Sequence, residues 1–209
     1  MPRLMVIVII LLLATTGYAT QKAITDTGEE VILNSDGTWI FTNNPKSKEK
    51  AINTNETEFK RPDSSTFLLK STNNNSAFWV NTNKWSFKKA TGNTEAEYEL
   101  ELKGNDLYGM VITEAIDIPV ESLTDIVLTN AKSAAPDIEI TEREYRYVNG
   151  NKVIYMVMSG TMQGIKVTFL GYYYSDASGS TQLLTYTGSN LVGKHKTEIT
   201  DFLNGLSLK

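Results

Sequence analysis

Alternating apolar and polar residues from residue 97 onward predict a set of β-strands. In residues 97–102, three apolar side chains alternate with three glutamates, as in a strand with one face on a core and one in water. Residues 153–158 are apolar throughout, which indicates a central strand covered on both faces. Asn149-Gly150 between two apolar runs is a strong hairpin signal. The strands predicted here are 97–102, 107–116, 138–148, 152–159, 165–174 and 182–187.

Two segments change to the spacing of an amphipathic helix. Residues 120–134 place their apolar side chains on one stripe, Pro119 suits the first turn, and Pro136 prevents continuation. Residues 196–205 show a second apolar stripe. One sheet, a helix between its strand groups and a helix at the end predict an α+β fold, with an antiparallel sheet flanked by helices. This main domain is expected to span residues 66–209.

Residues 20–42 predict a small β-hairpin that is separate from the main domain. Two apolar runs flank Asn34-Ser35-Asp36-Gly37, which suits a type I turn closed by a glycine. A two-stranded hairpin is marginal in water, so with Trp39 and Phe41 this one is expected to dock onto the body, a second copy or a partner. Residues 43–65 have almost no large apolar side chain and predict a flexible linker.

The order of these elements also resembles that of a known family, and five segments contribute to the resemblance. It lies in FWVNTNKW (78–85), the helix after IDIPVESL (116–123), YRYVNGNKVIYM (145–156), GIKVTFLGYYYS (164–175) and ITDFLNGL (199–206). Over about residues 67–209, this pattern resembles the Mog1/PsbP-like domains. The resemblance implies an α/β/α sandwich. Members of that fold include photosystem-associated, GTPase-binding and type VI secretion chaperone proteins, so it implies binding and assembly rather than catalysis.

Residues 1–19 have the build of a secretory signal peptide. Arg3 precedes an uninterrupted apolar run over 4–13, and Gly17-Tyr18-Ala19 supplies a small-x-small cleavage site. The run is shorter than the roughly 20 residues that span a bilayer. We therefore expect export to the periplasm or the medium and no transmembrane span in the mature chain; an uncleaved anchor is the alternative.

Composition excludes several kinds of chemistry. The chain has 209 residues, a net charge of −4, no cysteine and one histidine. An acidic chain without a basic run is not expected to bind nucleic acid or anionic membranes. One histidine and no thiol leave no zinc or thiolate site, and we expect no metal and no cofactor. His195 lies between two lysines and is expected to be a solvated residue at the start of the last helix.

Catalytic motifs are sparse. Nucleophile-elbow and phosphate-cradling loops are absent from the sequence, and the turn at 34–37 lacks the anchoring acids of an EF-hand loop. The row Glu95, Glu97, Glu99 and Glu101 is most simply a solvated strand face. Its alternative, a pair of catalytic carboxylates, requires two acids in different environments.

The candidate binding residues are aromatic. Tyr172–Tyr174 are consecutive and, with tyrosines of the preceding strands, could line one side of a groove; alternatively they pack beneath the helices. The predicted interaction residues are Trp39, Phe41, Tyr145, Tyr147, Tyr172, Tyr173 and Tyr174.

These observations favour a non-enzymatic, exported binding or assembly protein that acts through protein–protein contacts in the cell envelope. Its N-terminal hairpin would contact a protein partner or a second copy. One alternative is a small-molecule or lipid carrier with a cleft between sheet and helix, lined by Tyr172–Tyr174, Met156 and Met158. Another is a hydrolase with surface carboxylates.

Overall fold

The main sheet of the protein has eight strands in the order β4-β10-β11-β12-β13-β9-β8-β7. The computed structural model describes residues 21–26, 28–33, 39–41, 51–91 and 95–208; the predicted signal peptide and the turn at 34–37 lie outside them. The strands are β4 (Asn53–Phe59), β7 (Trp85–Lys89), β8 (Tyr98–Leu102), β9 (Leu107–Glu114), β10 (Glu139–Val148), β11 (Asn151–Met162), β12 (Ile165–Asp176) and β13 (Gly179–Gly188). Neighbours are antiparallel except for β4 and β10, which are parallel.

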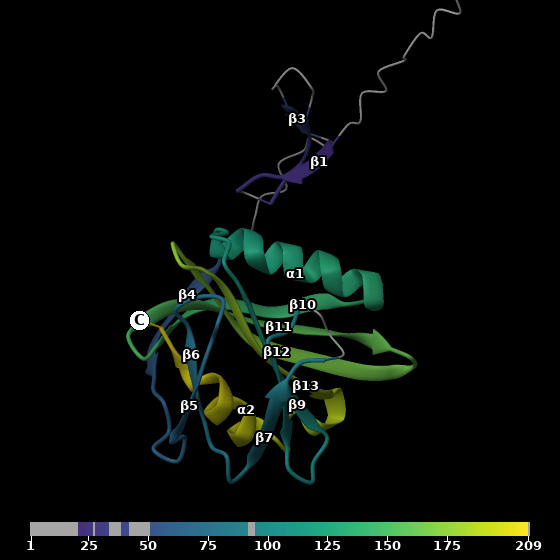
Figure 1. Cartoon of the computed structure of the whole chain (residues 1–209). Coiled ribbons are helices and arrows are strands. Elements are labelled where there is room, and N and C mark those ends of the chain that lie inside the picture. The colour runs from purple at the N-terminus through teal and green to yellow at the C-terminus, as the bar shows by residue number, and fades with distance from the viewer. Residues whose placement is uncertain (1–20, 27, 34–38, 42–50, 92–94, 209) are drawn as a thin grey trace, which may run out of the picture.

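Helices lie on both sides of this sheet. Helix α1 (Val120–Ala134) packs on β11 and β12, and α2 (Lys196–Leu203) packs on β12 and β13 from the opposite side (Figure 1). A 3-10 turn, η1 (Ser189–Leu191), precedes α2. A second sheet of β14 (Leu206–Ser207), β6 (Ala77–Val80) and β5 (Phe67–Lys70) packs on the α2 side. The predicted α+β architecture is therefore confirmed.

Each helix covers its own core. The α1-side core contains Leu123, Ile154, Met156, Met158 and Tyr173. The α2-side core contains, among others, Trp85, Leu100, Tyr155, Tyr172 and Phe202. Every residue of the predicted central strand 153–158 is buried, because its alternate side chains enter the two cores.

The turn that joins β10 to β11 also follows its sequence signal. Asn149 and Gly150 have φ angles of 50° and 81°, which is the left-handed pair that a two-residue type I′ hairpin requires. The side chain of Asn149 donates to the backbone oxygens of Asn204 and Leu206, at 2.9 and 2.7 Å. The turn thus holds the end of α2 and the start of β14 as well as the hairpin.

Part of the predicted linker is wrong, because residues 53–59 form β4. This edge strand carries mainly polar side chains and is held by polar contacts. Asn55 Nδ2 donates to Glu144 Oε1 at 3.1 Å, Gly150 N donates to Glu58 Oε1 at 2.7 Å, and Asn149 N donates to the backbone oxygen of Phe59 at 2.9 Å. A strand that buries so little apolar surface lacks the alternation by which strands are predicted. Residues 43–50 of the linker lie outside the described chain.

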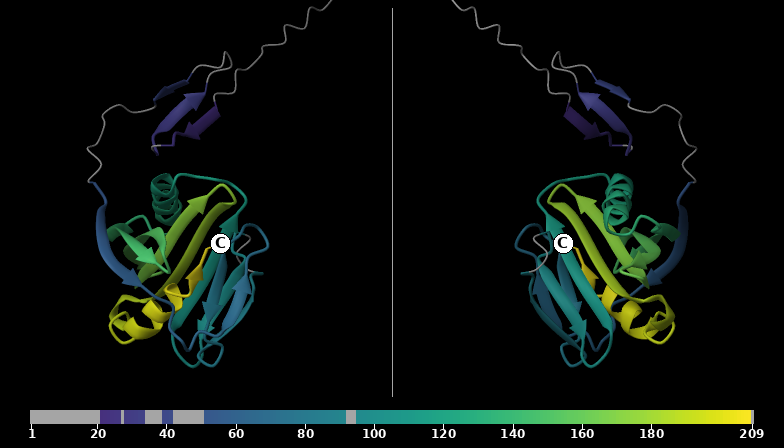
Figure 2. Two further views of the ribbon diagram at one scale, coloured as in Figure 1. Left: turned by 90° about the vertical axis from the view of Figure 1, so that its left-hand side faces the viewer. Right: turned by 90° about the vertical axis from the view of Figure 1, so that its right-hand side faces the viewer.

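The N-terminal hairpin is confirmed but incomplete. Strands β2 (Glu30–Leu33) and β3 (Trp39–Phe41) pair antiparallel, with Val31 opposite Phe41. A further strand, β1 (Gln21–Ile24), pairs with β2 and makes a three-stranded sheet. Four residues without clear alternation gave no strand signal for β1. Figure 2 shows this N-terminal sheet beyond α1, apart from the main sheet.

His195 is buried rather than solvated, which corrects the sequence prediction. It is 3% exposed, and its Nε2 atom has no hydrogen-bond partner among the described residues. Its backbone oxygen accepts from Ile199 N at 2.9 Å in the first turn of α2. Both flanking lysines are exposed, so sequence neighbours do not indicate the direction in which a residue points at a helix start.

Within the described chain, no helix has the length and apolar character that crossing a membrane requires.

Candidate functional site

The three consecutive tyrosines of β12 do not form one surface. Tyr172 and Tyr173 are each 1% exposed and point into opposite cores, Tyr172 on the α2 side and Tyr173 on the α1 side. Tyr174 is half-buried against the α2-side core. Alternation along a strand imposes this division, so the expected tyrosine-lined groove is not formed.

The tyrosines of β10 lie on the α1 side. Tyr145 is half-buried against the α1-side core and its hydroxyl donates to Glu121 Oε1, while Lys152 Nζ lies 3.9 Å from the centre of its ring. Tyr147 follows two residues later on the same face and is half-buried. Met156 and Met158 are buried in the α1-side core, so the cleft expected for a carrier is filled by side chains.

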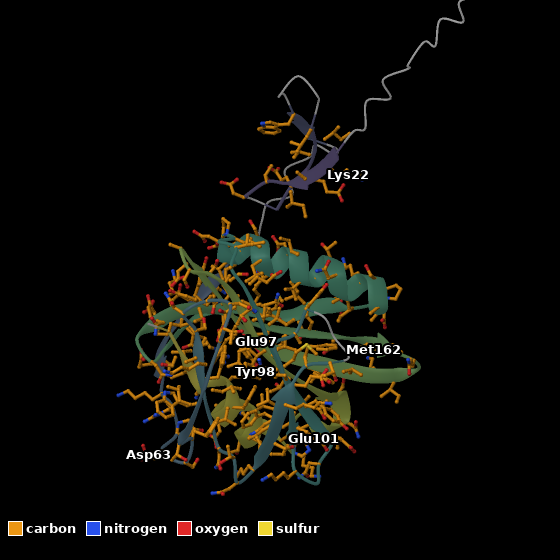
Figure 3. All side chains as sticks on the ribbon, in the orientation of Figure 1. Lys22, Asp63, Glu97, Tyr98, Glu101 and Met162 are labelled. Atoms are coloured by element: carbon orange, nitrogen blue, oxygen red, sulfur yellow. The ribbon has the colours of Figure 1, made fainter. Side chains whose placement is uncertain are left out.

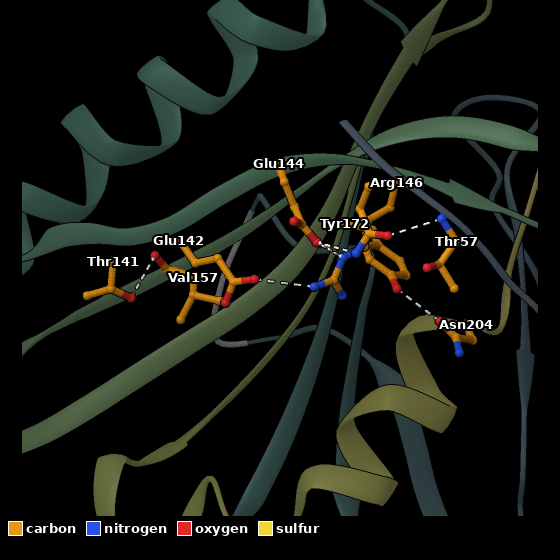
Figure 4. Close-up of polar contacts among 9 residues, drawn as sticks. Thr57, Thr141, Glu142, Glu144, Arg146, Val157, Tyr172 and Asn204 are labelled. Atoms are coloured by element: carbon orange, nitrogen blue, oxygen red, sulfur yellow. Dashed lines mark hydrogen bonds and ion pairs between the residues drawn. The ribbon is translucent and has the colours of Figure 1, made fainter. Parts of the chain in front are cut away.

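A cluster around Arg146 ties several elements together on the α2 side (Figure 4). Its Nε donates to Glu144 Oε1 at 2.6 Å, and its terminal nitrogen reaches Glu142 Oε1 at 3.4 Å. The guanidinium carbon lies 3.4 Å from the ring centre of Tyr155 and 4.8 Å from that of Phe59. The cluster joins β4, β10 and β11, which indicates a structural role.

Buried tyrosine hydroxyls make the fold sensitive to alkali. Burial raises the pKa of Tyr155 to about 12, and burial together with the Glu121 hydrogen bond raises that of Tyr145 to about 12. A raised folded-state pKa favours the protonated form, so its stabilisation is present below pH 10, the ordinary tyrosine value, and is lost as the pH rises through 12. We expect unfolding over this range, measured by circular dichroism alongside phenolate absorbance. In Tyr155→Phe the transition should be shallower; full phenolate formation with native circular dichroism would contradict the prediction.

The N-terminal sheet touches the body at the start of α1. The Ser122 hydroxyl donates to the backbone oxygen of Asp26, and a Cβ at Gly28 would lie 3.1 Å from Asp125 Oδ2. Asp125 is itself paired with Arg143 Nη1 at 2.8 Å. A cavity of about 330 Å³ borders this contact and is lined by Ile24, Thr25, Asp26, Asp117, Ile118, Pro119, Ser122 and Ile126.

The predicted aromatic residues of the N-terminal sheet lie on β3, the strand beyond β2. The indole of Trp39 is 51% exposed, and the side chain of Phe41 lies outside the described part of the chain. Ile24 and Leu33 are also exposed, at 46% and 38%. The small sheet therefore presents apolar side chains to solvent while its β1–β2 turn contacts α1.

A further surface, missed by the sequence analysis, lies beside α1 on the same face of the main sheet. Phe169 of β12 packs against the α1-side core and stands opposite Tyr186 of β13; Tyr186 stands opposite Tyr108 of β9, and Tyr108 opposite Glu101 of β8. Residues directly opposite one another in antiparallel strands share a face. This surface, called the open sheet face below, consists of Glu99, Glu101, Tyr108, Met110, Ile112, Gln182, Leu184 and Tyr186.

The aromatic rings of this face form a continuous row. The centres of the Phe169 and Tyr186 rings lie 5.6 Å apart, and those of Tyr186 and Tyr108 lie 5.3 Å apart in a stacked arrangement. The side chains of the open sheet face are half-buried, apart from the exposed Glu101 and the buried Leu184. Because α1 packs on β11 and β12, β13, β9 and β8 have no helix upon this face within the described residues. The sequence signal that could have indicated this exposed face is the pair of polar residues Gln182 and Glu101, which alternate with buried neighbours.

The predicted row of glutamates, in β8 and just before it, has different surroundings at Glu97, Glu99 and Glu101. Glu97 accepts hydrogen bonds from Thr72 N at 2.7 Å and from the Thr113 hydroxyl; burial raises its pKa, but these bonds outweigh burial and lower the pKa overall. Glu99 pairs with Lys88 at 3.1 Å. Glu101 is exposed and lies far from α1 in the view of Figure 3. Glu97 thus lacks the raised pKa that a general acid needs, and Glu99 and Glu101 give the open sheet face a charged margin.

Comparison with known proteins places the fold. No protein-family model and no curated protein matches the sequence. Among solved structures, cyanobacterial PsbP from Synechocystis sp. PCC 6803 is similar to this chain with a TM-score of 0.53 at 14% identity, over 71% of this chain and 95% of that one. A protein of unknown function from Pseudomonas aeruginosa follows with a TM-score of 0.45 at 12% identity, over 60% of this chain and 83% of its own. The body therefore has a PsbP-like fold, as the order of its elements predicted.

Proposed function

We propose that this chain is an exported, non-enzymatic binding or assembly protein that holds a protein partner on its open sheet face. The observation that carries the proposal is the aromatic row of Phe169, Tyr186 and Tyr108, which continues from the α1-side core onto a part of the sheet that no helix of the described chain covers. Stacked tyrosines combine apolar area with a polar tip and are enriched in protein interfaces.

The rest of the molecule supports this function. The pattern of residues 1–19 favours export, and the body is similar in fold to cyanobacterial PsbP. The N-terminal sheet, with Trp39 51% exposed, offers a second contact area near the start of α1.

Site-specific photo-crosslinking in the cells that make the protein would test this function. With p-benzoylphenylalanine in place of Tyr186, we expect a defined adduct with one partner, because the side chain stands in the middle of the row. The matched control carries the same group at Asn130, which is exposed on α1. The adduct at position 186 should weaken when Tyr108→Ser is added. Equal labelling from both positions, or no adduct from position 186, would contradict the proposal.

A further inference from the structure

We propose that the open sheet face receives a single amphipathic helix of the partner, which lies beside α1 with basic residues toward Glu101. The inference rests on the proposed function and specifies the kind of partner. It follows from the width of the uncovered sheet, the chemistry of its side chains and the charge along its margin.

The uncovered part of the sheet is wide enough for one helix. A helix with its side chains is about 10 Å across, and neighbouring strands lie about 4.8 Å apart, so one helix covers about two strands. Helix α1 packs on β11 and β12 in this proportion. Strands β13, β9 and β8 follow directly in the sheet, so a second helix beside α1 would cover about two of these three strands and leave β8 at its margin.

The side chains of the face suit an apolar helical stripe. Tyr108, Met110 and Ile112 alternate along β9 and point to the same side, with about 7 Å between successive members. The three side chains therefore span about 14 Å, which is the length of about two and a half helical turns of about 5.4 Å, so the apolar stripe of one helix can contact all three. An extended segment would instead seek free backbone groups, which a sheet offers at its edges and not on its face.

The negative charges at the margin of the open sheet face favour a basic helix. Glu101 is exposed opposite Tyr108 and makes no ion pair with any described residue. Glu114, at the end of β9, is also exposed, whereas Lys88 is engaged by Glu99 at 3.1 Å. Carboxylates around an apolar patch favour lysine or arginine on the flank of an incoming helix and oppose acidic residues there.

A second copy of the chain supplies no such helix from its described residues. The apolar stripes of both helices are buried in the cores of their own chain: Leu123 of α1 is 1% exposed and Phe202 of α2 is 3% exposed. Either helix would have to leave its core to bind a neighbouring molecule. Neither of the two described α-helices is therefore available, and the proposed occupant is a helix of a different protein.

Synthetic peptides of about five helical turns would test the inference. The first has a leucine stripe flanked by lysines, the second replaces those lysines by glutamates, and the third has the composition of the first in an order without a stripe. Fluorescence anisotropy gives the Kd of each for the wild-type chain. We expect the first peptide to bind at least about tenfold more tightly than either of the others, because only it matches both stripe and charge.

Variants locate the binding. Tyr186→Ser should weaken binding of the first peptide by about tenfold or more, and Glu101→Gln by a few-fold with a smaller salt dependence. Phe87→Ser is the matched control, since Phe87 is 36% exposed on β7 outside the open sheet face and should leave the Kd unchanged. Equal binding of the striped and unstriped peptides, or no effect of Tyr186→Ser, would overturn the inference.

Three further outcomes distinguish the helix site from the other possible occupants and from the proposed function. A concentration-dependent dimer that Tyr186→Ser abolishes, measured by light scattering after gel filtration, would place a second copy on the face and overturn the inference. A specific photo-crosslink at position 186 without peptide binding would remove the helix and leave the binding function standing. Peptide binding without any crosslink in cells would support the helix site and count against the proposed function.

Discussion

The Gly179→Ala variant is expected to lose about 3 kcal/mol or more of its free energy of unfolding. Gly179 begins β13 at φ 135°, a region that side chains rarely adopt. A Cβ there would lie 2.0 Å from the backbone oxygen of Glu114 and 3.0 Å from Cα of Ala115. Both neighbours belong to the backbone at the end of β9, so no flexible side chain can give way. The β12–β13 hairpin must separate from β9 to admit the methyl group.

Two control variants separate backbone strain from steric contact as causes of the loss. The free energy of unfolding of each variant is measured by urea unfolding at constant pH. Gly150→Ala has the left-handed strain alone, because φ is 81° and no atom lies within 4 Å of the new Cβ; we expect a loss of about 1 kcal/mol. Gly193→Ala meets neither strain nor contact and should change stability by less than about 0.5 kcal/mol. If Gly179→Ala cost no more than Gly150→Ala, the close approach to Glu114 would not be the cause.

The Arg146→Met variant is expected to lose about 3 kcal/mol. Its guanidinium is 16% exposed, lies 3.4 Å from the ring centre of Tyr155, and bonds Glu144 at 2.6 Å. Methionine keeps much of the apolar volume but leaves the Glu144 carboxylate, itself 20% exposed, without its cation. The loss should therefore come mainly from an uncompensated charge rather than from an empty space.

A double variant checks this explanation. Adding Glu144→Gln to Arg146→Met removes the uncompensated charge and keeps an oxygen for Asn55, whose Nδ2 lies 3.1 Å from Glu144 Oε1. The double variant should be more stable than Arg146→Met alone by about 1 kcal/mol or more, as measured by thermal and urea unfolding. No recovery would contradict the charge explanation. Arg146→Lys should fall between the wild type and Arg146→Met, because an ammonium keeps the charge but lacks the planar stacking surface.

Segments with a strong local period were predicted well. Helix α1 has the predicted bounds 120–134, because a full apolar stripe between Pro119 and Pro136 leaves no other boundary. The alternation of residues 97–102 correctly placed Tyr98, Leu100 and Leu102 in the core. In these segments the local pattern and the tertiary packing favour the same structure.

Elements that depend on distant partners were missed. Strand β4 has no apolar period, and its place beside β10 depends on Asn55, Glu58 and the turn at Asn149. The direction of His195 depends on how α2 meets the sheet. The open sheet face could not be predicted for a different reason. Tyr108 and Tyr186 follow the same alternation as core residues, and they are half-buried only because α1 does not extend over them.

The parallel pairing of β4 with β10 has a mechanical consequence. The chain that follows the N-terminal sheet enters β4 at Asn53. At the other end of this strand, the backbone oxygen of Phe59 accepts a hydrogen bond from Asn149 N. Traction on the N-terminal sheet along the strand axis therefore loads the β4–β10 ladder in shear, so that its bonds resist together instead of opening one at a time. A partner that pulls on the N-terminal sheet would therefore load this ladder as well as the contact between Asp26 and Ser122 of α1.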